Sequence, residues 1–314
     1  MSTQRPKTRL FAPSAAACLA VLLAALALAV PAGASTNASA VKRGVAFIAR
    51  SKLSAFEFGF KADAISALDA ARKSGATVKS SSITRLADAL QDDAAGYATS
   101  AGAAGKVMLG AVAAGRNPRN FGSDQGGRID VYAVINLYYS KGRYGSTAYD
   151  QAFAMLGLAA GHEPVPKAAI SFAKQRRGKH GWGFSLSGGA GDDVQSTALM
   201  IQALRAAGVK RSDNALQSAY KWIRFQRNIN GGYNQDGNGG ETNANATALV
   251  IQAADALGKD ANDAKRALRA LQLKNGAFRL TPTADAGSKL LATMDPVLAL
   301  AGRHYPVVMR SKHG

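Results

Sequence analysis

The sequence predicts an all-α fold: an α/α toroid (α6/α6 barrel) of about six helix-pair repeats, preceded by a signal peptide. Three observations predict it. The chain begins with an apolar leader, one phrase then recurs at near-constant spacing, and two kinds of helix alternate between the recurrences. With 314 residues, the chain is long enough to bury a large core without covalent cross-links.

Residues 1–34 have the features of a secretory signal peptide. Three basic residues lie within the first nine, residues 15–30 are an apolar run, and residues 32–34 read Ala-Gly-Ala, a small-x-small cleavage signal. The apolar run is shorter than the ~20 residues that span a bilayer comfortably. We therefore expect cleavage after Ala34 and a secreted or cell-envelope location, with an uncleaved membrane anchor as the alternative.

Composition limits the chemistry of the mature chain. The only cysteine, Cys18, lies in the leader, so a disulfide, a thiol nucleophile, a thioester and a thiolate-bound zinc are all excluded. The formal net charge of the whole chain is +19, and only three of its basic residues lie in the leader. This surplus predicts attraction to an anionic cell-surface polymer or lipid. Because the chain is exported, we expect no nucleic-acid partner.

A phrase of small and apolar residues that ends in glycine recurs six times. It reads DAISALDAARKSG at 63–75 and STALMIQALRAAG at 196–208, and four similar phrases occupy the other repeats. A period of this length is the signature of a repeat architecture. Each phrase predicts an inner helix, apolar on most sides and closed by a glycine that adopts the left-handed conformation readily. The closing residues are Gly75, Gly115, Gly161, Gly208, Gly258 and Gly302.

Helices of a second kind are predicted between these phrases. In 215–226, Leu216 and Tyr220 lie on an apolar stripe, whereas Lys221 and Arg224 lie opposite them, and 264–272 has the same pattern. These amphipathic helices form the outside of the fold and carry much of its positive charge. Because no polar end caps are evident, we predict a closed ring over residues 35–305 in preference to an open solenoid, followed by a basic C-terminal tail at 306–314.

The loops after the outer helices also share a pattern. Gln175, Gln226 and Gln272 are each followed by a short polar stretch, then glycine and an aromatic residue near 181–184, 231–233 and 276–278. With the inner phrase Thr-Ala-Leu-x-Ile-Gln-Ala, this pattern resembles the Gln-Trp motif of squalene-cyclase-type repeats. The chain thus resembles the terpenoid cyclase and protein prenyltransferase α/α-toroid superfamily, well over 167–302 and periodically over 42–161. The resemblance implies a fold and leaves the chemistry open.

The catalytic motif of the cyclases is incomplete in this chain. Squalene-hopene-type cyclases use Asp-x-Asp-Asp-Thr-Ala, in which the middle aspartate protonates the polyene. In alignment with that motif, this chain has Gln195 at the acid position, and the next repeat has Asn245 there. The chain therefore has no recognisable catalytic acid at the family's position, and the sequence favours a non-catalytic protein while leaving catalysis open. The alternative is a terpene-cyclase-like enzyme in which Asp192 or Asp193 supplies the acid from a shifted position.

Other members of the superfamily fit less well. Protein prenyltransferases and complement-type thioester domains need a cysteine that the mature chain lacks. The chain is also similar to the helical domain of the cobalamin carriers transcobalamin and intrinsic factor, but their additional β domain has no room after Gly302. The resemblance therefore implies no cofactor.

We predict that a ligand binds where the N-termini of the inner helices converge on one mouth of the ring. Polar side chains at helix N-termini also act as caps, and aromatic residues also pack between repeats, so both alternatives stay open. The predicted ligand-binding residues are Tyr149, Asp150, Trp182, Phe184, Asp193, Gln195, Tyr233, Asn243 and Asn245.

One loop resembles half of a calcium site. Asn234, Asp236 and Asn238 alternate before Gly239 as in an EF-hand, but Asn245 occupies the position of the bidentate glutamate. A glycine-rich turn accounts for the same residues, so we predict no metal.

Taken together, these patterns predict an exported repeat protein that binds a small apolar or mixed ligand in its central funnel. A structural or protein-interaction scaffold at the cell surface is a further alternative.

Overall fold

The computed structural model describes residues 36–53, 58–124, 126–188, 191–237, 239–284 and 289–307. The predicted leader with Cys18, residue Asn238 and most of the predicted tail at 306–314 lie outside the described residues. Residues from Asn37 onward form one compact unit, and the description below concerns that unit alone.

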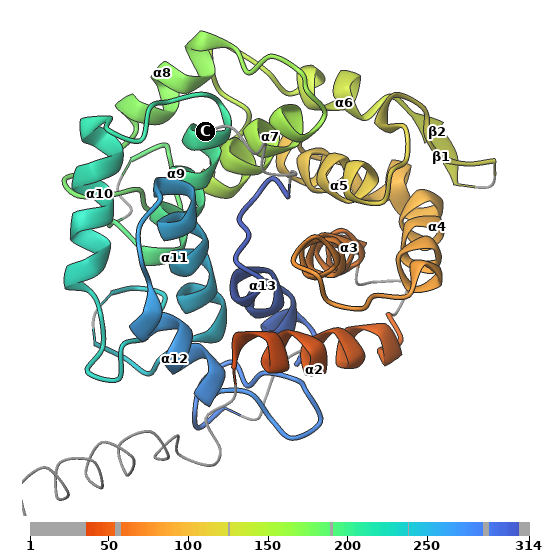
Figure 1. Ribbon diagram of the computed structural model, residues 1–314. Helices are drawn as coiled ribbons and strands as arrows, with labels where there is room; N and C mark the ends of the chain where they lie inside the picture. Colours follow the sequence, from red (N-terminus) through yellow and green to blue (C-terminus); the bar gives the residue numbers. More distant parts are fainter. Residues whose placement is uncertain are drawn as a thin grey trace, which may run out of the picture. The chain divides into compact units, whose positions relative to one another are not determined.

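Six helix pairs make up the unit, and the first helix of each pair lies outside the second (Figure 1). The outer helices are α2 (Asn37–Arg50), α4 (Ser80–Tyr97), α6 (Val131–Leu137), α8 (Lys167–Gln175), α10 (Asn214–Phe225) and α12 (Asn262–Ala270). The inner helices are α3 (Phe58–Lys73), α5 (Ala101–Ala113), α7 (Ala148–Ala160), α9 (Val194–Ala206), α11 (Ala244–Leu257) and α13 (Leu291–Leu300).

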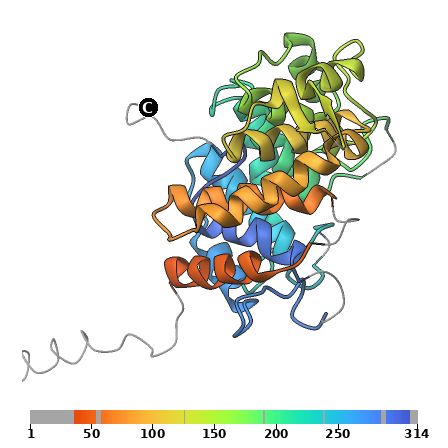
Figure 2. The same ribbon diagram turned by 90° about the vertical axis from the view of Figure 1, so that its right-hand side faces the viewer.

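The inner helices form a closed ring. Each packs on the next along the chain, and α13 packs on α3 and also on α2. Figure 1 looks along the axis of this ring, and Figure 2 shows it from the side, where α2 and α3 are seen along their lengths. The predicted α/α toroid of six helix pairs is therefore confirmed. Among the described residues, every helix falls short of the length and hydropathy needed to cross a membrane.

One element was not predicted. Between α5 and α6, the short 3-10 helix η1 (Pro118–Asn120) leads into a small antiparallel hairpin of β1 (Phe121–Ser123) and β2 (Gly127–Ile129), in which Phe121 pairs with Ile129. The hairpin packs on α4, and Phe121 is buried there.

Small residues set how closely the inner helices approach one another. A Cβ placed on Gly157 of α7 would lie 2.8 Å from Cα of Gly105 of α5, and a Cβ on Gly105 would overlap the carbonyl oxygen of Phe153. Such distances are below van der Waals contact, so only glycine permits this approach.

Each inner helix ends one or two residues before one of the six recurring glycines. Five of the six closing glycines have positive φ, for example +87° at Gly208 and +69° at Gly258. Gly161 is the exception, because its φ is −76° and the left-handed conformation falls on the next residue, His162, at 58°. The helix still ends at the predicted place, one residue before the chain reverses.

A buried side chain in each of four inner helices holds the preceding loop. The backbone N–H of Trp182 donates to Oγ1 of Thr197 at 2.9 Å, and that hydroxyl donates back to the carbonyl of Trp182 at 3.1 Å. In α7, Oε1 of Gln151 accepts a hydrogen bond from the backbone N–H of Tyr144 at 2.9 Å. The remaining two pairs are Thr247 with Tyr233 and Thr293 with Phe278. These contacts place the four helices in the same register.

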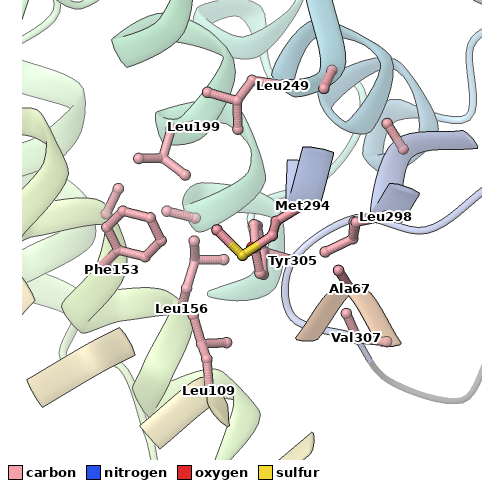
Figure 3. Packing of buried hydrophobic residues seen from close by; sticks show 14 of the residues in the cluster. Ala67, Leu109, Phe153, Leu156, Leu199, Leu249, Met294, Leu298, Tyr305 and Val307 are labelled. Atoms are coloured by element: carbon pink, nitrogen blue, oxygen red, sulfur yellow. The ribbon is translucent and has the colours of Figure 1, made fainter. Parts of the chain in front are cut away.

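The chain after α13 crosses the ring at the C-terminal ends of the inner helices. The backbone N–H of Tyr305 donates to Oε1 of Gln202 at 3.0 Å, and Nζ of Lys73 donates to the carbonyl of Val307 at 2.8 Å. In Figure 3, Tyr305 and Val307 lie among Leu156, Met294 and other buried apolar side chains. This segment therefore covers the opening of the ring at the C-terminal ends of the inner helices.

Candidate ligand site in the ring

The shared register brings two layers of side chains to the ring axis. Gln151, Thr197, Thr247 and Thr293 each hold a loop, as described above. In each of these four helices, the side chains two positions before and two positions after that residue point toward the ring axis. On α9 these are Gln195 and Leu199, on either side of Thr197, and the other three helices repeat the arrangement. The upper layer is Tyr149, Gln195, Asn245 and Leu291, and the corresponding residues of the lower layer are Phe153, Leu199, Leu249 and Asp295. The lower layer is completed by Asp63 of α3 and Lys106 of α5.

These residues line a cavity of about 200 Å³ on the ring axis. Its floor includes Tyr305, from the C-terminal segment. The cavity lies toward the N-terminal ends of the inner helices, as predicted for the ligand, because its lining residues come from their first two turns.

One side of the lower layer is charged. Nζ of Lys106 donates to Oδ2 of Asp63 at 2.6 Å, across the α3–α5 contact. Burial by itself lowers the pKa of Lys106, but the attraction of Asp63 and Tyr97 outweighs it, so that the pKa is raised. Lys106 therefore stays cationic, and its ammonium also lies 4.9 Å from the centroid of the Phe153 ring.

Asp295 completes the charged side from α13. Nε2 of Gln252 donates to the backbone carbonyl of Asp295 at 3.4 Å, and Tyr305 lies beside Asp295 in the lining of the cavity. Burial and, to a smaller extent, the neighbouring Asp63 raise the pKa of Asp295, Lys106 opposes them, and the net result is a pKa of about 7. Near neutral pH the carboxyl group therefore takes up a proton far more readily than an exposed aspartate, and in its protonated form it can donate as well as accept a hydrogen bond.

The other side of the lower layer is apolar. Phe153, Leu199 and Leu249 are buried there, and the ring of Tyr305 meets that of Phe153 edge-on at 6.3 Å between centroids. Leu291 extends this surface into the upper layer. The cavity is therefore divided into a charged half and an apolar half.

The upper layer adds neutral polar groups. The hydroxyl of Tyr149 donates to Oε1 of Gln195 at 2.8 Å, and burial raises the pKa of Tyr149. The side-chain oxygen of Asn245 is buried without a hydrogen-bond partner among the described residues. A buried acceptor without a donor is costly to folding, which makes this oxygen a natural contact for a ligand.

Three of the nine predicted ligand-binding residues line the cavity: Tyr149, Gln195 and Asn245. Three others make capping contacts at inner-helix N-termini. Asp193 accepts a hydrogen bond from the Ser196 N–H at 2.7 Å, and Asn243 accepts one from the Ala246 N–H at 3.0 Å. Asp150 accepts hydrogen bonds from the hydroxyls of Ser100 and Thr147 near the start of α7.

The remaining three are aromatic residues of the loops. Trp182 and Tyr233 are buried, and Nε1 of Trp182 donates to the carbonyl of Ala173 at 2.7 Å, so both pack between helices. Phe184 is 59% exposed, and its ring lies 5.9 Å from that of Tyr149, which lines the cavity. Ligand binding by all nine residues stays a prediction.

The two aspartates proposed as a shifted acid lie outside the cavity lining. Asp192 accepts a hydrogen bond from the backbone N–H of His180 at 2.8 Å and so holds the loop before α9. Asp193 is the N-cap of α9. Burial raises its pKa, and the hydrogen bonds from Ser196 oppose that shift.

The calcium-like loop forms a local turn. The side-chain oxygen of Asn234 accepts a hydrogen bond from the Gly237 N–H at 2.6 Å, as the glycine-rich-turn alternative expects. Asp236 follows in the same loop, and Asn238 lies outside the described residues. Within the described ranges, no group of three or more His, Cys, Asp or Glu side chains is placed to hold a metal ion.

Sequence reasoning missed the charged half of the cavity. Asp63, Lys106 and Asp295 all lie within the recurring phrases, which were interpreted only as apolar inner helices. A charged residue in an otherwise apolar helix was the available signal. Counting two residues on from Thr197, Thr247 and Thr293 would have placed Asp295 at the level of Leu199 and Leu249.

Comparison with known proteins identifies the fold. No protein-family model and no curated protein matches the chain. Among solved structures, the chain is similar to the type II terpene cyclase MstE from Scytonema in its apo form, with 14% identity, a TM-score of 0.57, and coverage of 84% of this chain and 97% of that one. It is also similar to a variant of MstE in complex with geranylgeranyl dihydroxybenzoate, the substrate of that enzyme. This match has 13% identity and a TM-score of 0.58, and it covers 84% of this chain and 96% of the MstE chain. This chain therefore has the α/α-toroid fold of the terpenoid cyclases.

Proposed function

We propose that this protein binds a small amphipathic ligand in the cavity on the ring axis. The observation that carries the proposal is the division of the cavity into a charged half, formed by Asp63, Lys106 and Asp295, and an apolar half opposite. A polar group of the ligand would meet the charged half, and its apolar body would contact Phe153 and the leucines. At about 200 Å³ the cavity is below the ~300–1,000 Å³ of sites for drug-sized ligands, so the ligand is small.

The polar group of this ligand is best matched by a hydroxyl. The side-chain oxygen of Asn245 lacks a donor, and the protonated Asp295 carboxyl offers one. A hydroxyl can donate to the first and accept from the second, whereas a carbonyl can only accept. A hydroxyl also adds no net charge to the Asp63–Lys106 pair.

The test is native mass spectrometry of the protein purified from its own host, followed by solvent extraction of the bound material. We expect one small molecule per chain, lost when Leu249→Trp fills the cavity and retained in Lys221→Trp, a matched change on an exposed outer helix. If the native protein has the mass of the bare chain, and no hydroxylated apolar compound raises its melting temperature, the proposal fails.

A second function, acid catalysis on the bound ligand, is favoured by one observation. Asp295 faces the cavity and is held partly protonated at neutral pH, as a general acid must be. In this alternative, Asp295 replaces the shifted acid at Asp192 or Asp193. Incubation with isoprenoid alcohols and analysis of the products would reveal turnover, which Asp295→Asn should abolish and Asp192→Asn should leave intact.

The location of the protein also remains a proposal. The leader supports export, and the basic residues of the outer helices support attachment to an anionic polymer or lipid of the cell surface. Fractionation of the host, with the N-terminus determined by mass spectrometry, tests both. The expected result is a chain that begins at Ser35 and is released from the envelope by salt.

A further inference from the structure

A second cavity lies outside the ring, along the first outer helix. Its volume is about 850 Å³, and it is separate in its lining residues from the cavity on the ring axis. One wall is α2, where the lining residues from Ala38 to Arg50 recur every three or four positions and so form a stripe along the helix. The other lining residues come from the segment 74–79, which connects α3 to α4, from Ser82 in the first turn of α4, and from the end of α13. We call this cavity the α2 groove.

The floor of the α2 groove is apolar. Val41 and Val45 of α2 are buried there, as is Leu300 of α13, and Val78 of the connecting segment packs against the same core. Most of the other lining residues of α2 are alanines, which leave space above the floor. The stripe from Ala38 to Arg50 gives the groove a length of about 18 Å at the rise of an α-helix.

The charges along the groove have one sign. Lys42 and Arg50 lie on the α2 wall and Lys79 on the wall formed by the connecting segment, and none of the lining residues is acidic. All three cations are exposed, and none makes an ion pair with a described residue. A pocket with an apolar floor and an uncompensated cationic rim is complementary to a molecule with an apolar tail and an anionic head.

The start of α4 adds to the preference for an anion. Its N-cap is Lys79, whose side chain makes no capping hydrogen bond, and Ser82 of its first turn lines the groove. The free N–H groups and the dipole at the start of an 18-residue helix favour negative charge nearby. Thr77 adds a further hydroxyl on the same wall, whereas the hydroxyl of Ser74 donates to the carbonyl of Ala71 at 2.7 Å.

We propose that the α2 groove binds a single-chain anionic lipid, with its acyl chain along α2 and its carboxylate or phosphate head at Lys42, Arg50 and Lys79. The shape of the groove favours a lipid over an acidic helix. An extended acyl chain is far thinner than a helix about 10 Å across, so it can lie along the apolar floor between the two walls. The proposal does not depend on the function of the cavity on the ring axis.

The test is isothermal titration calorimetry of the secreted chain with dodecyl phosphate, kept below its critical micelle concentration. We expect saturable binding of one molecule per chain and no comparable binding of dodecyltrimethylammonium. The double change Lys42→Glu with Lys79→Glu should weaken binding about tenfold, because two attractions are replaced by repulsions. Lys221→Glu with Lys265→Glu makes the same change in net charge on other outer helices, and it should leave the affinity unchanged.

A space-filling change separates the groove from non-specific adsorption. Ala46→Trp places a large side chain in the groove on a partly exposed helix face, where folding tolerates it, and should abolish binding. Gln195→Leu, in the cavity on the ring axis, should leave it unchanged. Equal binding of the cationic amphiphile, or full affinity in Ala46→Trp, would overturn the proposal. A dimer in light scattering that Ala46→Trp dissociates would also overturn it, by assigning the groove to a second copy of the chain.

Discussion

Replacement of Asp295 by asparagine should change how the stability of the protein depends on pH. The pKa of Asp295 rises from 3.8, the ordinary value for the side chain, to about 7 in the folded chain. A raised pKa means that the folded state holds a proton that the unfolded state has released. This contribution to stability is fully present below about pH 4 and is lost as the pH rises through about 7. Asparagine keeps the size of the protonated group and cannot ionise.

The size of the effect follows from the linkage between proton binding and folding. Well below the folded pKa, the wild-type free energy of unfolding should fall by about 1.4 kcal/mol per pH unit through this group alone, and the total loss from about pH 5 to pH 7 should be about 2 kcal/mol. Above the pKa the loss levels off. The free energy of unfolding of Asp295→Asn, relative to wild type, should therefore be about 3 kcal/mol more favourable at about pH 8 than at about pH 5.

Urea unfolding at the two pH values measures this difference, with the fluorescence of Trp182 and Trp222 as the signal. Asp260→Asn, the same chemical change at an exposed position, is the control, and its difference from wild type should vary little between the two pH values. A difference for Asp295→Asn that stays constant with pH, or that is larger at the lower pH, would refute the assignment of a raised pKa to this carboxyl group.

Substitutions at three further positions, Thr247, Gly105 and Asp193, test contacts of the ring. The melting temperature in thermal unfolding measures the change in stability of each variant and its control. Thr247→Val removes both hydrogen bonds to the Tyr233 loop and should cost about 1–3 kcal/mol, whereas Thr247→Ser should recover most of the loss. Gly105→Ala should cost about 1–3 kcal/mol because the new methyl group overlaps the backbone of α7, while the control Gly96→Ala, in open space on α4, should stabilise by about 0.5–1 kcal/mol. Asp193→Ala should cost about 0.5–2 kcal/mol through loss of the α9 N-cap, and Asp193→Asn should restore it; equal melting temperatures for Asp193→Ala and wild type would exclude the capping role.

The fold could be predicted from the sequence because its determinants are local and repeated. The glycine that ends each inner helix acts through its own backbone, and the stripe on an outer helix is a property of that helix alone. Even the one displaced turn, at His162 instead of Gly161, moved no helix end. The hairpin of β1 and β2 could not be predicted, because it occurs in one repeat only and its strands are three residues long.

The candidate site was predicted only in part, and the reason is physical. Gln195 and Asn245 were found because they lie at the start of recognisable phrases. Asp63, Lys106 and Asp295 acquire their chemistry only from one another, across contacts between helices far apart in the sequence. The acid at Asp295, where α9 and α11 have Leu199 and Leu249, was visible in the sequence, but the groups that face it from other helices were not.

The closure of the ring between α13 and α3 has a consequence for any ligand on its axis. Asp63 and Asp295 come from the first and the last inner helix, so the charged half of the cavity spans the joint between the two ends of the chain. A molecule that contacts both carboxyl groups links α3 to α13 reversibly. Its binding free energy then stabilises the contact between these two helices. Hydrogen exchange should show this as slower exchange in α3 and α13 in the presence of ligand, with little change in the outer helix α10, which contributes no residue to the cavity.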